Sequence, residues 1–482
     1  MDVEKFVSLL PGYYPYPESF QQRDSASFLM VRDEQQKYLA VLGEGSKRFE
    51  GTALSDNLRL CPLNGRNAAL IREIFPELKP GPASKKISFG FGDRLGLATP
   101  AHIKSLGNRP VFPVFAQQSV RENNRTKRTF QNIVDDAFWG CFQAGYIGPF
   151  GADADHLKEI SQIKEAISAG YSMFTIDLSD YLNPPPPLSS PARGEDSLTT
   201  SLPLEGGGVG GGDMENFFKD KEYTIAGKSY RFSLPEIRRL IVTFVPGLNF
   251  AMECYQTLKA SLPAVDFEVS VDETKQTTTP LSHIFVVEYL RRNGVSFTSL
   301  APKFPGEFEK AIDYKGDLAE FAEGFRQHTE ICRFFGGYRL SVHSGSDKFA
   351  VYPIIRKISD AFHIKTAGTS WLQAVKTLAL RTPSFYRRIH QCALNNISQD
   401  RIGYSVNLNL NKIPALENIE DEDLVTLFSL PDCRQLLHIT YGSVLAQFQP
   451  EIFSGLHQYE EDHYQLITEH LNKHLDVLLP GG

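Results

Sequence analysis

The segment GADADHLKE at 151–159 brings together the side chains best suited to chemistry. Asp153, Asp155 and His156 follow a short apolar run and precede a helical pattern. A neutral imidazole beside a carboxylate can pair a ligand for a divalent metal with a general base. The alternative is structural, with Asp155 capping the next helix and His156 exposed in its first turn. The local sequence leaves both interpretations open.

A second carboxylate is expected inside the fold. In FEVSVDET (267–274), period-2 alternation places Glu268 on the face opposite Phe267 and Val269. A buried carboxylate needs a partner such as a metal, a lysine or a substrate. Glu268 is therefore a candidate acid, base or metal ligand, and a structural ion pair is the alternative.

Another strand-like segment, SVHSGSDKF (341–349), contains His343. A histidine within a strand is either a satisfied core residue or a ligand. The turn after it favours a ligand-binding role, because its glycine lets the backbone approach closely and because Asp347 and Lys348 supply charge.

Further polar groups complete a candidate substrate site. Lys303 is a possible anion clamp and Glu307 a possible metal ligand, although a solvated loop also explains them. Other groups at the ends of strand-like runs are Asp93, Arg94, Gln117, Gln118, Asp177 and Lys365. This mixture of amides, carboxylates and cations suits a polyhydroxylated substrate with an acid group, which an arginine can bind bidentately.

Eight short apolar runs must position these groups. They are ISFGFGDR (87–94), PVFPVFAQQS (110–119), YIGPFGADADH (146–156), MFTIDLSD (173–180), DFEVSVDE (266–273), FTSLAPKF (297–304), RLSVHSGSDK (339–348) and FHIKTAGTS (362–370). Polar groups at the C-terminal ends of eight strands are typical of a (β/α)8 barrel with its site at the top. Helical patterns between the runs supply the crossovers that parallel strands need. We predict an α/β fold, a TIM-like (β/α)8 barrel with an N-terminal cap and a helical C-terminal extension.

The chain divides into three expected parts. They are an N-terminal cap at 1–85, a catalytic barrel at 86–394 and a helical extension at 395–482. Within the cap, residues 28–45 predict a β-hairpin and residues 67–75 a short helix. The segment 183–213 is rich in Pro, Gly and Ser without periodicity, and we expect a disordered insertion with no chemical role.

Composition limits the class of protein. The net charge of −7 argues against nucleic acid and anionic membranes as partners. The sequence has no run near the ~20 apolar residues of a membrane span, and its start lacks a secretory signal. The six cysteines have no metal-binding spacing, which favours a reducing compartment. We expect a cytoplasmic protein that binds a small molecule, while the sequence does not indicate its oligomeric state.

Several long motifs resemble the tagaturonate epimerase family. They are FGFGDRLGLATPAH, PVFAQQSVRENNRT, GADADHLK, MFTIDLSD, SLAPKFPGEFEKAIDY and LSVHSGSDKF. The resemblance runs from about residue 86 to near residue 470, apart from 183–213. Members of this family interconvert D-tagaturonate and D-fructuronate with a divalent metal, in bacterial uronate catabolism.

The resemblance implies roles for particular residues. Asp155 corresponds to the proton acceptor, Glu268 to the opposing proton donor, and His156 and His343 to metal ligands. For the third ligand our choice is Glu307, with Asp177 as the substitute. Arg94, Gln117, Asp177, Lys303, Asp347 and Lys348 remain the candidate substrate-binding residues. Mixed nitrogen and oxygen ligation suits Zn, Mn, Co, Ni and Fe alike.

The chemistry of the two sugar acids favours one route. They differ at the carbon β to the ketone, whose C–H is not appreciably acidic, so simple deprotonation is a poor route. We expect retro-aldol cleavage and re-addition, assisted by a Lewis-acidic metal, and the rival is transient oxidation by hydride transfer. Two other functions stay open: a metal-dependent ketose isomerase or aldolase on the same barrel, and a non-catalytic sugar-acid binding protein.

Overall fold

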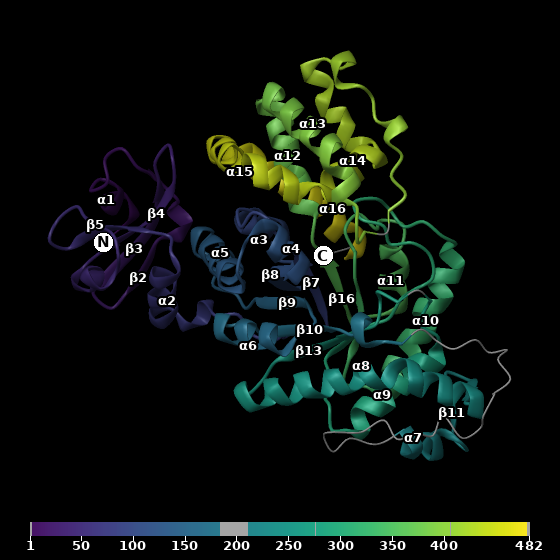
Figure 1. Cartoon of the computed structure of the whole chain (residues 1–482). Helices are drawn as coiled ribbons and strands as arrows, with labels where there is room; N and C mark the ends of the chain where they lie inside the picture. Colours follow the sequence, from purple (N-terminus) through teal and green to yellow (C-terminus); the bar gives the residue numbers. More distant parts are fainter. Residues whose placement is uncertain (1, 184–210, 275, 405, 480–482) are drawn as a thin grey trace.

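The computed structural model describes residues 2–183, 211–274, 276–404 and 406–479. A β-sheet formed by the first part of the chain lies to one side of a central barrel, and a group of helices from the last part lies above the barrel (Figure 1). The predicted insertion at 183–213 falls mostly outside the described residues, and its last three positions begin a helix. No helix in the described part of the chain has the length and apolar character needed to cross a membrane.

The N-terminal sheet is antiparallel, with strand order β1-β3-β4-β6-β5 and β2 paired to β3. Its strands are β1 Tyr14–Pro15, β2 Gln21–Arg23, β3 Ala26–Arg32, β4 Lys37–Leu42, β5 Thr52–Ala53 and β6 Leu58–Pro62. The helices of this part are α1 Val3–Val7, α2 Gly65–Ile74 and the short 3-10 helices η1 Pro17–Ser19, η2 Glu44–Arg48 and η3 Pro76–Leu78. The pairing of β3 with β4 confirms the predicted hairpin, and α2 confirms the predicted helix.

Both faces of this sheet are buried, which explains why residues 28–31 of β3 form a continuous apolar run rather than alternating. Phe28 and Met30 pack in a cluster with α2 and with aromatic residues of α5 Phe130–Gln143 of the barrel. Leu29 and Val31 face the other way and pack against Phe6 of α1. The sheet is therefore joined to the barrel through a shared apolar layer.

Eight parallel strands form a closed barrel, which confirms the predicted fold class. The strands are β7 Ile87–Phe91, β8 Phe112–Ser119, β9 Gly151–Leu157, β10 Met173–Asp177, β13 Asp266–Ser270, β14 Ser299–Ala301, β15 Arg339–Val342 and β16 Phe362–Thr366. Seven of them lie within the predicted runs, and β9 extends one residue beyond its run, to Leu157. Pairing of β16 with β7 closes the barrel.

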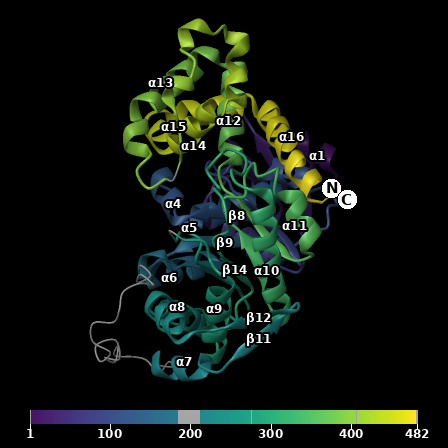
Figure 2. The same cartoon turned by 90° about the vertical axis from the view of Figure 1, so that its right-hand side faces the viewer.

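Helices cover the outside of the barrel. They are α3 Thr99–Leu106, α4 Val120–Thr126, α5, α6 Ile160–Ala169, α8 Leu234–Ser261, α9 Pro280–Arg292, α10 Leu318–Phe335 and α11 Tyr352–Ile358. Between β10 and α8 lie η4 Ser179–Tyr181, α7 Gly211–Phe218 and the hairpin of β11 Glu222–Ile225 and β12 Lys228–Arg231. Figure 2 shows α7 and this hairpin at the end of the molecule opposite the C-terminal helices.

The last strand leads directly into the C-terminal helices. These are α12 Thr369–Arg381, α13 Pro383–Asp400, η5 Leu410–Lys412, η6 Leu416–Asn418, η7 Asp421–Ser429, α14 Pro431–Ile439, α15 Tyr441–Gln458 and α16 Glu460–Leu478. Most of them form a core of their own. Helix α16 instead buries Ile467, Leu471 and Leu475 in the barrel core, so the end of the chain is fixed to the barrel.

Candidate active site

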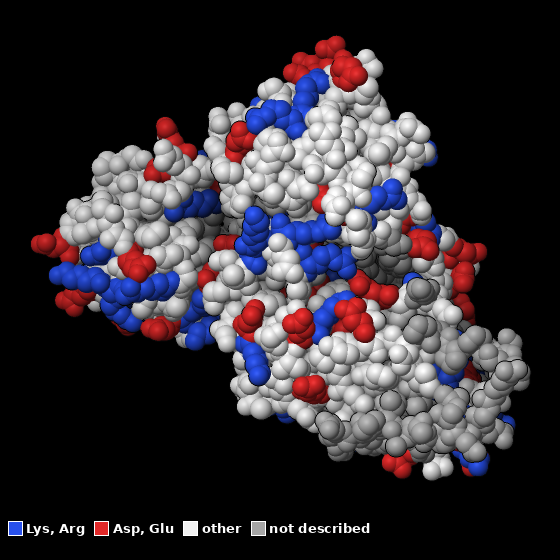
Figure 3. Space-filling model, in the orientation of Figure 1, with Lys and Arg blue, Asp and Glu red and all other residues white. Residues whose placement is uncertain are grey.

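A cavity of about 330 Å³ opens where the barrel strands end, which is where this fold places its sites. Its ionisable lining comprises Arg94, Arg121, Glu122, Asp155, His156, Lys158, Asp177, Asp272, Glu273, Lys310, His343, Lys365 and His438. Lys and Arg side chains gather at the centre of the face shown in Figure 3, between the C-terminal helices and the barrel. Tyr404 and His438 lie beyond the barrel strands, so the C-terminal region contributes part of the wall.

A buried ammonium ion connects the carboxylates at the base of this cavity. Nζ of Lys365 lies 2.8 Å from Asp153 Oδ2, 2.8 Å from Asp155 Oδ1 and 2.9 Å from Glu268 Oε1. It also donates a hydrogen bond of 2.5 Å to Thr175 Oγ1. Since β9 points two of these side chains inward and β10, β13 and β16 one each, the closed barrel brings together groups that are more than 200 residues apart in the chain.

The backbone at His156 is strained, with φ of 58°. Neighbouring side chains on a strand normally face opposite sides, yet Asp155 and His156 both line the cavity. The left-handed turn at His156 allows this, at a cost on the order of 1–3 kcal/mol. Asp155 lies within β9 and Glu159 is the N-cap of α6, so the helix-capping explanation of Asp155 is wrong.

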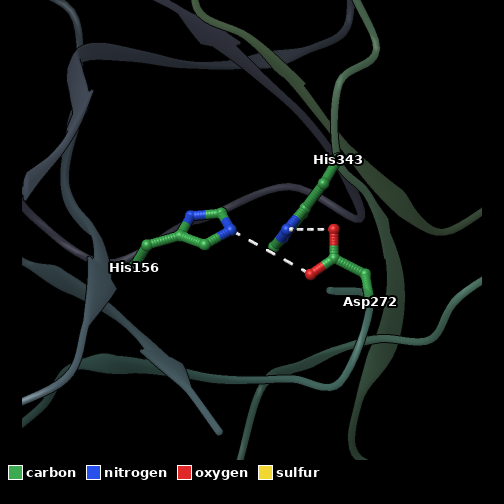
Figure 4. Close-up of side chains that lie close together, drawn as sticks. All are labelled: His156, Asp272 and His343. Carbon is green, nitrogen blue, oxygen red and sulfur yellow. Dashed lines mark ion pairs between the residues drawn. The ribbon is translucent and has the colours of Figure 1, made fainter. Parts of the chain in front are cut away.

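Two imidazoles and one carboxylate form a candidate metal centre. His156, Asp272 and His343 offer ligand atoms that all lie within 4.8 Å of one another, and Figure 4 shows the three side chains converging. Asp272 Oδ2 is 3.2 Å from His343 Nδ1, and its Oδ1 is 4.0 Å from His156 Nε2. Two histidines with one carboxylate are a ligand set typical of divalent transition metals with open coordination positions.

The surroundings of this centre also suit a cation. The far nitrogen of each ring is held by a carboxylate: His156 Nδ1 lies 2.7 Å from Asp155 Oδ1, and His343 Nε2 lies 2.7 Å from Glu268 Oε1. Metal-binding histidines usually have such a partner, which fixes the tautomer and the ring orientation. The chemistry of the donors therefore fits a divalent ion.

The carboxylates around the two imidazoles make the electrostatic environment of the candidate metal centre negative. Burial opposes charge on the two rings, but Asp155 raises the pKa of His156 to about 8 and Asp272 raises that of His343 to about 10. Burial, together with Asp155 and Glu268, raises the pKa of Asp153 to about 6, although Lys365 opposes this. The site therefore favours an additional positive charge.

The described residues contain two other groups of possible ligands. In the first, Asp347 Oδ1 lies 2.7 Å from His470 Nε2, and His474 Nε2 accepts a hydrogen bond of 2.9 Å from the backbone of Asp347. These atoms already pair with one another, so the cluster joins α16 to the loop after β15 through polar contacts. The second group shares His156 with the main centre and includes the exposed Glu273.

Most of the predicted site residues meet at one place. Asp155, His156, His343, Arg94, Gln117 and Asp177 all line the cavity. Gln117 donates a hydrogen bond of 3.1 Å to Asp155 Oδ2, whereas Asp177 lies 3.2 Å from Lys158 Nζ. Arg94 is bonded to Glu122 at 2.8 Å.

Glu268 has a different position from the one we expected. Its side chain is fully buried and is absent from the cavity lining. Oε2 accepts a hydrogen bond of 2.7 Å from Ser299, while Oε1 contacts His343 and Lys365. Glu268 therefore lies behind these two residues and does not face the cavity directly.

The predicted third ligand is not with the imidazoles. Glu307 is exposed and lines an adjacent cavity of about 320 Å³, as does Lys303. Asp272 occupies the position that we assigned to Glu307. Its place two residues beyond Ser270, on the same inward face as Glu268, was the signal in the sequence that could have identified it.

Asp347 and Lys348 also lie outside the substrate cavity. Asp347 bonds to Arg434 at 2.8 Å and to His470. The fully buried Lys348 donates hydrogen bonds to the carbonyls of Glu309 at 2.8 Å, Ile312 at 2.5 Å and Ser346 at 3.0 Å. Both side chains are engaged in the loops around the site. Ser344 and Ser346 still line the cavity, and the chain leaves it at Asp347, where the backbone is left-handed (φ 60°).

The chain is similar to known proteins over nearly its whole length. A family model described as tagaturonate epimerase matches residues 16–478. The tagaturonate/fructuronate epimerase of Thermotoga maritima is 43% identical over 477 residues, which cover 97% of each chain. A glycerol-complexed crystal structure of the fructuronate-tagaturonate epimerase UxaE from Cohnella laeviribosi has a TM-score of 0.90 at 35% identity and covers 99% of this chain and 98% of that one. Its native form has a TM-score of 0.89 at 34% identity, with 98% of this chain and 99% of that one covered. The chain therefore belongs to the tagaturonate epimerase family and is an enzyme of the epimerase type.

Proposed function

We propose that this enzyme interconverts D-tagaturonate and D-fructuronate with the help of a divalent cation, in the cytoplasm, by inversion at C4, the carbon β to the C2 ketone. One observation carries the proposal: in a chain of the tagaturonate epimerase family, His156, Asp272 and His343 converge beside Asp155 in a cavity lined by lysines and arginines. Such a lining suits an anionic, polyhydroxylated substrate.

His156, Asp272 and His343 would hold the cation, which is one of Zn, Mn, Co, Ni or Fe. When bound, a divalent cation supplies Lewis-acid stabilisation of negative charge on substrate oxygen. Asp155 and Glu268 orient the two rings through the far nitrogens.

Asp155 is the proposed base. It lines the cavity, and Lys365 and Gln117 fix its two oxygens. Burial opposes its charge, but His156 and Lys365 hold the pKa of Asp155 well below its usual range, so it is a carboxylate. Asp155 takes the proton of the C4 hydroxyl, the C3–C4 bond breaks, and its electron pair moves to the C2 oxygen to give an enediolate and an aldehyde. After the aldehyde turns by half a rotation, C3 attacks its other face and the new C4 oxygen is protonated.

Lys365 is the proposed donor of the second proton, because Lys365 lines the cavity and touches Asp155, whereas Glu268 does not line the cavity. Glu268 is then a positioning residue for Lys365 and His343. The role implied by family resemblance, with Glu268 as the proton donor itself, is the alternative.

The test is to incubate the purified enzyme with D-fructuronate and follow D-tagaturonate by NMR, before and after chelation and with each metal restored. Loss of activity on chelation and recovery on addition of metal are expected. Formation of an aldose or sustained release of aldehyde would instead identify an isomerase or an aldolase. A large primary isotope effect with deuterium on C4 would refute retro-aldol cleavage, since that route leaves the C4–H bond intact.

A further inference from the structure

The cavity of about 330 Å³ at the ends of the barrel strands is the substrate cavity of the proposed function. Almost all of its Lys and Arg side chains are paired with carboxylates of the protein. Arg94 is bonded to Glu122 at 2.8 Å, Arg121 to Glu273 at 3.2 Å, and Lys158 to Asp180 at 2.9 Å, while Lys365 contacts three carboxylates. Among the described residues, Lys310 is the one Lys or Arg of this lining that has no carboxylate partner. Its ammonium donates a hydrogen bond of 2.7 Å to Ser344 Oγ.

Lys310 lies next to the candidate metal centre. Ser344, its hydrogen-bond partner, directly follows His343 in the chain and has a left-handed backbone, with φ of 52°. Both Lys310 and Ser344 line the substrate cavity and the adjacent cavity, so they stand where the two meet. An ammonium and a hydroxyl side by side can both donate to one carboxylate.

Hydrogen bonds from other parts of the chain fix the loop that carries Lys310. The carboxylate of Glu309 accepts hydrogen bonds from Gln435 at 2.7 Å and from Asn407 at 2.9 Å. Lys348 donates to the carbonyls of Glu309 and Ile312, on either side of Lys310. A cation fixed in place before the substrate arrives loses little conformational entropy on binding. The buried Lys348 thus gains a role in positioning Lys310.

We propose that Lys310, together with Ser344, binds the C6 carboxylate of the substrate and so determines the preference for sugar acids over neutral ketoses. This inference rests on the proposed function. Retro-aldol cleavage between C3 and C4 leaves the carboxylate on the aldehyde fragment, which must turn without leaving the site. A fixed contact with the carboxylate retains this fragment while its C4 end turns.

Lys303 is the rival for this role. Its ammonium donates a hydrogen bond to the carbonyl of Thr274. Lys303 lines the adjacent cavity but does not line the substrate cavity. Lys310 is favoured because it borders both cavities and because its neighbour follows a metal-ligand candidate. The two lysines therefore make different predictions for the same experiment.

The experiment compares Lys310→Met, Lys310→Arg and Lys303→Met, with Lys376→Met as the control. Lys376 has no ion pair among the described residues and lines a different cavity. D-gluconate and D-glucitol, which differ in a carboxylate, are measured as competitive inhibitors of fructuronate conversion and as ligands by calorimetry. Lys310→Met should weaken the binding of gluconate and raise KM for fructuronate by about 10- to 150-fold. The affinity for glucitol should change by less than about 3-fold. Lys310→Arg should recover most of the preference.

A second readout is the fraction of turnovers that release trappable aldehyde, which should rise in Lys310→Met. The proposal would be overturned if Lys310→Met left the ratio of gluconate to glucitol affinity unchanged, including the case in which both affinities fall equally. It would also be overturned if Lys303→Met, and not Lys310→Met, lost affinity for gluconate. A wild-type enzyme that does not convert fructuronate would refute the proposed function, and calorimetric binding of gluconate would still decide the role of Lys310.

Discussion

Replacing Glu268 by Gln tests which residue returns the proton. Gln keeps the size of the side chain and can still accept from Ser299, which now donates to Glu268 at 2.7 Å. It removes the negative charge that lies 2.7 Å from His343 Nε2 and 2.9 Å from Lys365 Nζ. Both neighbours remain, but each loses one of its charged partners.

The magnitude follows from the position of Glu268 behind a ligand. Loss of a carboxylate partner to a metal-binding histidine costs about 10- to 100-fold in metal affinity, or about 1.4–2.7 kcal/mol. If Glu268 only positions Lys365 and His343, kcat at saturating metal should fall by less than about 100-fold. An obligatory proton donor would contribute about 10²- to 10⁴-fold, and added metal would not replace it.

The assay measures metal affinity by calorimetry and kcat for fructuronate across a metal titration, with thermal unfolding as a check on the fold. Ser341→Ala is the matched control, since Ser341 Oγ is buried inside the same barrel and has no hydrogen-bond partner among the described residues. A decrease of kcat by more than about 100-fold at saturating metal, with Ser341→Ala unaffected, would refute the positioning role and favour Glu268 as the donor.

Three other outcomes are expected. Asp272→Asn should lower bound metal, measured by elemental analysis, whereas Glu307→Gln should not, because Asp272 and not Glu307 lies beside the two imidazoles; equal metal contents would contradict this assignment. Asp155→Asn should lower kcat by about 10²- to 10⁴-fold with protein folding retained, and a variant with near-normal kcat would exclude Asp155 as the base. Glu460 is buried and accepts a hydrogen bond of 2.7 Å from Tyr16, and although burial opposes it, Lys37 lowers the pKa of Glu460 below its usual 4.5. Because the folded-state pKa is lowered, this stabilisation is present above pH 4.5 and is lost as the pH falls further. Glu460→Gln should therefore be less stable than the wild type at pH 7 by about 3 kcal/mol, with a gap that narrows below pH 4.5 in chemical denaturation; a constant gap would contradict the linkage.

The barrel was predictable because its signals are local. Each of the eight apolar runs matches one observed strand to within a residue, and the helical patterns between them became the crossovers. Such patterns report which face of an element is buried, and parallel strands joined by helices have few possible arrangements. The hairpin of β3 and β4 was found for the same reason.

The candidate site was predicted only in part. Asp155, His156 and His343 were found because each ends a strand with an unusual local motif. Glu307, Asp347 and Lys348 were assigned to the site from their nearness in sequence to such motifs, but turns after β14 and β15 direct them elsewhere. His438 had no local signal, since it reaches the cavity from α14.

By itself the sequence determined the elements, their order and the type of chemistry, because periodicity and residue type are properties of short segments. The tertiary structure decided which charges meet and which stay apart. Closure of the barrel brings Lys365 to the carboxylates of β9 and β13, leaves Glu268 behind it, and sets Asp272 beside two imidazoles. The interaction between two charges depends on the distance between them in space, and the order of residues in the chain does not specify that distance.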